Sequence, residues 1–261
     1  MIVNFFQSLE RRGVEYLLIS GQASVLYGAA VFSEDIDLWV KPVEANLRAF
    51  LDALRDSGAR YHKLTPPLTE DFACRGHGFH FVVPDETDVF LDVMGVPPRV
   101  GLFEAARVGA VWMDSDWGNL PVISLPELIE LKKTQRLEDY PIISRLALLF
   151  LGRHTGRIDD PLVDWVLDHL FTVEALSEFL GASRIEWAGY HGQHEDDLRT
   201  WRQELASPSG WTDSTERALT NWMQRRLAEL QAADREYWKP VIRELKRLHQ
   251  EGLLMPVGQN V

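Results

Sequence analysis

Two neighbouring segments near the amino terminus constrain the fold of this chain more than any other feature. Residues 16–28 read Tyr-Leu-Leu-Ile-Ser-Gly-Gln-Ala-Ser-Val-Leu-Tyr-Gly, which predicts an apolar strand, a glycine turn and a short helix. Residues 33–40 read Ser-Glu-Asp-Ile-Asp-Leu-Trp-Val and predict a second strand that opens with two aspartates. Since side chains alternate between the two faces of a strand, Asp35 and Asp37 should project from the same face.

Two carboxylates that project side by side repel each other, and a divalent cation relieves that repulsion. Mg²⁺ prefers hard oxygen ligands and keeps coordination positions for water and phosphate oxygens, and Mn²⁺ accepts similar ligands. A carboxylate pair beside a glycine turn therefore predicts metal-assisted phosphoryl chemistry at Asp35 and Asp37.

Composition limits the class of protein. The 261 residues are 46% hydrophobic, enough for a substantial core, and the single cysteine, Cys74, excludes an internal disulfide framework. Residues 1–12 lack the basic start and long apolar stretch of a signal peptide, so we expect a cytoplasmic protein without a membrane span. A formal net charge of -12 disfavours extended DNA binding, although basic clusters remain near residues 132–136 and 225–247.

The order of the sequence patterns predicts the fold class. Strand and helix signals alternate in the first half, and helical signals dominate beyond Arg157. We therefore expect a mixed α/β (α+β) domain over residues 1–155, followed by a helical domain over residues 156–261. The expected strands are residues 14–20, 35–40, 79–83, 89–94 and 120–124, with 84–88 as a hairpin loop. The expected helices are residues 4–12, 22–27, 46–55, 126–136, 160–180, 195–205, 215–234 and 240–251.

One helix start carries a specific signal. Ser124-Leu-Pro-Glu127 places a serine at the N-cap, a proline in the first turn and a glutamate that completes a capping box. In the predicted helix 126–136, Lys132 and Arg136 are neighbours at i and i+4. Their two cationic groups can therefore bind the same triphosphate. The alternative is a surface ion pair of Arg136 with Glu130, Glu138 or Asp139.

A third carboxylate belongs to the second strand of the predicted hairpin. Asp92 shares its strand face with Phe90 and Met94. If this strand pairs beside residues 35–40, Asp92 joins Asp35 and Asp37 on one face. Such a trio can hold one or two Mg²⁺ ions for attack on an α-phosphate, and Asp92 can also accept the proton of the attacking hydroxyl.

These motifs resemble a known superfamily. Gly21-Gln22, twelve further residues and Asp35-Ile-Asp-Leu38 are similar to the signature of the polymerase β type nucleotidyltransferases. That signature reads hydrophobic, Gly, Gly or Ser, spacer, Asp-hydrophobic-Asp-hydrophobic, and Asp92 lies where the superfamily places its third carboxylate. Residues 122–139 also look like the strand and helix that end the catalytic domain of bacterial proteins related to AbiEii toxins, where a Lys, an Arg and an Asp close the motif.

The resemblance covers about the first 150 residues and implies transfer of a nucleoside monophosphate from an NTP to a hydroxyl, with Mg²⁺. It implies metal ligation by Asp35, Asp37 and Asp92. The residues that it implies for phosphate binding are Ser20, Gly21, Gln22, Ser24, Lys132 and Arg136. Gln22 replaces the second glycine or serine of the turn, so its amide either crowds the phosphates or binds them.

The acceptor is open. The acidic chain favours a protein side chain or a small molecule, including an antibiotic, as the acceptor. A tRNA end is the alternative acceptor if the basic helices line one groove. The competing hypothesis is a degenerate binding scaffold, such as one half of a toxin and antitoxin pair with a partner protein. A metal-dependent phosphohydrolase is a third alternative.

Four histidines are further candidates for a functional site. His77 and His80 flank Gly78 before a strand and, with Arg75, can reach the site from a loop, although a structural role is the simpler interpretation. His191 and His194 have metal-like spacing, but Gly192 interrupts the helix that would align them on zinc.

Overall fold

The computed structural model describes residues 2–261, which form two compact units. The first consists of residues 2–131 and Glu236–Val261, and the second of Lys132–Arg235. The predicted fold class is confirmed, because a seven-stranded mixed sheet with flanking helices is followed by a mostly helical region. The predicted domain boundary at residues 155 and 156 falls inside the second unit. Among residues 2–261, no helix combines the length and apolarity that a membrane span requires.

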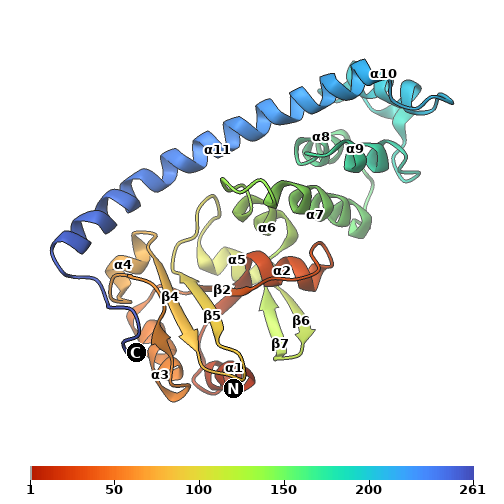
Figure 1. Cartoon of the computed structure of the whole chain (residues 1–261). Helices are drawn as coiled ribbons and strands as arrows, with labels where there is room; N and C mark the ends of the chain where they lie inside the picture. The colour runs from red at the N-terminus through yellow and green to blue at the C-terminus, as the bar shows by residue number, and fades with distance from the viewer. Residues whose placement is uncertain (1) are drawn as a thin grey trace. The chain divides into compact units, whose positions relative to one another are not determined.

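The sheet of the first unit has the strand order β3-β4-β5-β2-β1-β7-β6 (Figure 1). The β1–β7 and β2–β5 pairs are parallel, and the other neighbours are antiparallel. The strands are β1 (Tyr16–Ile19), β2 (Asp35–Val40), β3 (Arg60–Tyr61), β4 (Gly78–Val83), β5 (Val89–Met94), β6 (Val111–Ser115) and β7 (Gly118–Val122). The mixed pairing places β2 and β5 side by side at the centre.

Burial explains why the central strands form where the sequence predicts them. All four residues of β1 are buried, and β2 alternates from half-buried Asp35 to buried Ile36 and half-buried Asp37 before its buried end. The hairpin of β4 and β5 also forms as predicted. Strands β3 and β6 were not predicted; β3 has only two residues, and β6 is an edge strand whose residues are mostly exposed.

Helices and aromatic side chains cover the sheet of the first unit. Phe5 of the first helix packs edge-on against Phe50 of the third, at 6.0 Å between ring centroids, and Phe50 contacts Phe81 of β4. All three rings are fully buried and anchor the helices to the strands. These helices are α1 (Ile2–Arg11), α2 (Ser20–Tyr27), α3 (Glu44–Asp56), α4 (Glu70–Cys74), α5 (Phe103–Gly109) and α6 (Leu125–Leu131).

Helix α6 starts as predicted but is shorter. The amide of Glu127 donates to Ser124 Oγ at 3.5 Å, which confirms the serine cap, and Ser124 Oγ donates to Glu127 Oε2 at 2.8 Å. The helix ends at Leu131, so the prediction of a helix to residue 136 is wrong, as is the helical i, i+4 relationship of Lys132 and Arg136. The guanidinium of Arg99 donates to the carbonyl oxygens of Glu130 and Leu131, and these contacts satisfy acceptors that a continuing helix would have used.

The carboxy-terminal residues complete the first unit. Beyond the last helix, the amide of Met255 donates to the Thr65 carbonyl at 2.8 Å, and the amide of Tyr61 donates to the Gln259 carbonyl at 2.9 Å. The segment thereby pairs antiparallel along the β3 side of the sheet. This pairing covers an edge that would otherwise offer free backbone groups.

The second unit is helical. Its elements are α7 (Asp139–Arg153), α8 (Asp160–Asp168), α9 (Val173–Leu180), a 3₁₀ turn η1 (Trp187–Gly189), α10 (Glu195–Leu205) and the first part of α11 (Asp213–Gln250). The helix predicted over residues 160–180 is two helices, because Thr172 caps a new start at α9. The two helices predicted on either side of Pro240 are one, since the Glu, Lys, Arg and Leu residues around it favour helix.

Candidate functional site

The three predicted carboxylates share one face at the centre of the sheet. Asp37 of β2 lies directly opposite Asp92 of β5 in the parallel register, and Asp35 lies opposite Phe90. All three aspartates are half-buried, whereas Ile36 and its neighbours on the other face are buried. The condition on which the Asp92 prediction depended is therefore met, because the two strands are direct neighbours.

A histidine that sequence reasoning treated as structural lies against Asp92. His80 of β4 is aligned with Asp92 across the hairpin, and its Nδ1 is 2.7 Å from Asp92 Oδ1. Lys63 Nζ lies 3.9 Å from the other carboxylate oxygen. Burial on its own raises the pKa of Asp92, but the hydrogen bond and charge of His80, with the charges of Lys63 and His62, hold it below its ordinary value.

Two of the three carboxylates, Asp37 and Asp92, open into a cavity of about 260 Å³ that lies entirely within the first unit. Asp37, His80 and Asp92 form its polar side. Its apolar side comes largely from the last turns of α11, through Trp238, Val241, Ile242 and Leu245. This cavity, the carboxylate pocket, combines carboxylate and imidazole groups on one side with an apolar surface on the other.

An ion-pair cluster ties the end of α11 to the rim of this pocket. His77, almost fully buried before β4, has its Nε2 2.9 Å from Glu244 Oε2. Arg75 also pairs with Glu244, and Arg247 lies 3.6 Å from the same carboxylate. The hydrogen bond from His77 is the largest of the effects that hold the pKa of Glu244 below its ordinary value, and burial opposes them. His77 therefore positions the apolar wall.

The glycine turn lies beside the carboxylates, because Ile19 at the end of β1 is aligned with Asp37. Ser20 follows with a φ of 55°, a left-handed conformation that is uncommon outside glycine. At Gly21, a Cβ atom would lie 2.0 Å from Ser33 Oγ, so only glycine fits. The Gln22 amide donates to the Ser33 carbonyl at 3.0 Å, and the turn is thereby fastened to the residues that precede Asp35.

Besides Gln22, three further residues predicted to bind phosphate make internal contacts. Ser24 is fully buried and donates to the Ser20 carbonyl at 2.9 Å. Lys132 belongs to the second unit, where it is 3% exposed and its Nζ lies 2.9 Å from Asp139 Oδ1. Arg136 Nε lies 3.1 Å from the other oxygen of Asp139. The ion pair of Arg136 with Asp139, one of the alternatives drawn from the sequence, is thus present.

The carboxylate oxygens at the centre of the sheet are the candidate ligands for a divalent ion. Asp35, Asp37 and Asp92 supply hard carboxylate oxygens on one face, which is the donor chemistry that Mg²⁺ and Mn²⁺ prefer. Among residues 2–261, however, no three His, Cys, Asp or Glu side chains are grouped closely enough to hold a metal as they stand. The donor types suit such an ion, but Asp92 is held by His80, so the three carboxylates would have to regroup around it.

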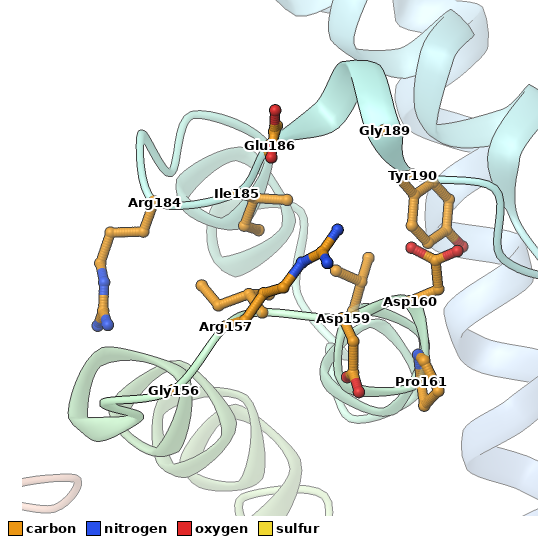
Figure 2. Close-up of a pocket in the computed structure, with 12 residues that line it drawn as sticks. Gly156, Arg157, Asp159, Asp160, Pro161, Arg184, Ile185, Glu186, Gly189 and Tyr190 are labelled. Atoms are coloured by element: carbon orange, nitrogen blue, oxygen red, sulfur yellow. The ribbon is translucent and has the colours of Figure 1, made fainter.

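The second unit has a larger cavity of about 460 Å³ (Figure 2). Figure 2 shows the Arg157 side chain extending across it towards the side that carries Asp160 and Tyr190. Two of its polar side chains form hydrogen bonds at helix ends. Arg184 donates to the carbonyl oxygens of Gly152 and His154 at the end of α7, and Asp159 caps α8. This cavity is therefore a weaker candidate than the carboxylate pocket.

Comparison with protein-family models gave no match for this chain, and comparison with curated proteins gave none either. The function is accordingly argued from the carboxylate pocket and the turn beside it.

Proposed function

We propose that this chain is a Mg²⁺-dependent nucleotidyltransferase that moves a nucleoside monophosphate from an NTP to a hydroxyl group of an acceptor. The observation that carries the proposal is the parallel register of Asp37 with Asp92, with Asp35 on the same face. The glycine turn supports it, because Ile19 is aligned with Asp37 and the backbone of Ser20 and Gly21 follows directly, beside the carboxylates.

The residues divide the work. Asp35, Asp37 and Asp92 hold the ion, which when bound gathers the phosphates and neutralises their charge. The backbone of Ser20 and Gly21 faces the phosphates, while Gln22 fixes the turn through Ser33. Ser24, Lys132 and Arg136 are left out of the proposed site because each has an internal partner.

The reaction joins the acceptor oxygen to the α-phosphorus, and the bond to the departing pyrophosphate breaks. Asp92 accepts the hydroxyl proton or directs it to solvent, and its hydrogen bond to His80 fixes the orientation of the carboxylate. Trp238, Val241 and Leu245, which are half-buried, give this side of the pocket an apolar surface against which the acceptor can pack.

The test is calorimetric titration of each NTP into the protein with Mg²⁺ or with EDTA. Binding should require Mg²⁺ and should be lost in Asp35→Asn/Asp37→Asn. Asp114→Asn is the matched control, because Asp114 is an exposed strand carboxylate on β6, away from the pocket. Equal NTP binding in EDTA, or undiminished binding by the double variant, would contradict the proposal.

A binding scaffold without turnover is the second candidate, and the contacts of Asp92 favour it. Asp92 is already engaged by His80 and Lys63, as expected of a carboxylate that has become structural. This alternative, a component of a toxin and antitoxin pair or a similar binding protein, predicts no metal-dependent NTP binding. Release of inorganic phosphate without an acceptor would instead indicate a phosphohydrolase.

A further inference from the structure

A second groove of the first unit is separate from the carboxylate pocket. It lies between α1, the start of β1 and the β6–β7 hairpin, and encloses about 470 Å³. None of its lining residues also lines the carboxylate pocket. We refer to it as the aromatic groove, after its rings Phe6, Tyr16, Trp112 and Trp117.

Tyr16 presents an unpartnered polar group to this groove. The residue is 8% exposed, its hydroxyl makes no hydrogen bond to another residue of 2–261, and the oxygen is not among the fully buried polar atoms that lack a partner. The hydroxyl is therefore open to the groove, where the polar end of a largely buried tyrosine can meet water or a ligand. The side chain lines the aromatic groove, so a bound ligand can supply the missing hydrogen bond.

The aromatic rings offer flat surfaces suited to a planar or cationic group. Phe6 and Trp117 are stacked with 5.4 Å between centroids and 4° between ring planes. Trp112, on the edge strand β6, is 55% exposed, and Arg107 lies over its ring at 5.0 Å. The chain's own guanidinium thus already uses one aromatic face as a cation site.

Acidic side chains give the groove its charge preference. Glu10 and Asp116 line it, are exposed, and form no ion pair within residues 2–261. Glu15, a third lining carboxylate, is instead paired with Lys41 at 2.8 Å. Burial raises the pKa of Tyr16 most, and the charge of Glu10 raises it further against a smaller opposite effect of Arg107. The two unpaired carboxylates outnumber the single guanidinium of Arg107 in the lining of the groove.

We propose that the aromatic groove binds a small organic cation in which a flat apolar body carries an amidine, guanidine or amine group. The body lies against the exposed ring surfaces of Trp112 and Trp117. The cationic group donates hydrogen bonds to Glu10 and Asp116, and the Tyr16 hydroxyl accepts one more. This site does not depend on NTP binding in the carboxylate pocket.

The test compares three probes of nearly equal shape: benzamidine, neutral benzamide and anionic benzoate. Each is titrated in EDTA into the ¹⁵N-labelled full chain, and the indole N–H signals of Trp112 and Trp117 are followed. We expect benzamidine to shift these two signals and to bind about tenfold more tightly than benzamide. Equal affinity for benzamide, tighter binding of benzoate, or no shift with any probe would overturn the proposal.

Substitutions locate the site. Glu10→Gln/Asp116→Asn should weaken benzamidine binding by about tenfold, whereas Glu44→Gln, an exposed helix carboxylate outside the groove, should leave it unchanged. Tyr16→Phe removes only the hydroxyl and should weaken binding while the thermal unfolding midpoint stays close to that of the parent. Undiminished affinity in both the double variant and Tyr16→Phe would overturn the assignment.

Discussion

His80 and Asp92 face each other across two antiparallel strands, with the imidazole Nδ1 2.7 Å from a carboxylate oxygen. This contact makes the third carboxylate of the site part of a hydrogen-bonded pair. It also determines how the pair responds to acid, because it helps to hold the pKa of Asp92 below its ordinary value of 3.8.

The first prediction concerns pH. Since the folded pKa of Asp92 is lowered, the carboxylate stabilises the fold above pH 3.8, and this contribution is lost as the pH falls through the lower folded pKa. In His80→Ala, burial acts on the carboxylate without its hydrogen-bond partner, so the pKa of Asp92 should rise. The ¹³C shift of the Asp92 carboxyl group, followed with pH, measures this change. An unchanged titration in His80→Ala would show that the contact does not govern Asp92.

The second prediction concerns the glycine turn. Gly21→Ala should destabilise the protein by about 1–3 kcal/mol, because the new methyl group overlaps Ser33. Ser33→Gly in the same chain should recover most of the loss. Gly101→Ala is the control, since nothing lies within 4 Å of its added carbon. Urea unfolding measures all variants, and equal stability of Gly21→Ala and the parent would contradict the predicted overlap.

The third prediction separates a structural role of Lys132 from a phosphate-binding one. Lys132→Met leaves Asp139, which is 2% exposed, without its buried partner and should cost about 3 kcal/mol in the free energy of unfolding. Arg136→Met removes a largely exposed partner of the same carboxylate and should cost about 0–1 kcal/mol. A stable Lys132→Met that loses NTP binding would support the phosphate-binding role instead.

The fourth prediction concerns the carboxy-terminal segment. A chain that ends at Gln250 loses the backbone hydrogen bonds to Tyr61 and Thr65 and exposes the β3 edge. We expect a lower unfolding midpoint and concentration-dependent association, because an uncovered edge can pair with a second chain. Light scattering and amide exchange at Tyr61 measure these effects. Gln259→Ala keeps the backbone contact and should behave as the parent, and a truncated chain that stays monomeric and equally stable would contradict this role.

Part of the site was readable from local patterns. The two-residue period of β2 placed Asp35 and Asp37 together, and the pairing of β5 beside β2 brought in Asp92. The position of His80 beside Asp92 also follows from the sequence. A symmetrical hairpin around the loop 84–88 pairs Val83 with Val89, and the same register pairs His80 with Asp92.

Other features depend on contacts between distant residues, which local patterns do not report. The end of α6 is set by Arg99, about 30 positions earlier in the chain, and the wall of the carboxylate pocket comes from α11. The continuity of α11 through Pro240 depends on good helix formers outweighing one lost hydrogen bond. The hydrophobic periodicity of the sequence does not show which of these opposing effects on a helix is larger.

The division of the chain has a consequence for its synthesis. Residues 132–235 interrupt the first unit in the sequence, so the ribosome makes the whole second unit before the last part of the first. Until Trp238 and Glu244 emerge, the three aspartates have no apolar wall and His77 has no carboxylate partner. A nascent or prematurely terminated chain would carry the carboxylates in an unfinished pocket, which delays any activity of this site until residues 238–244 have been made.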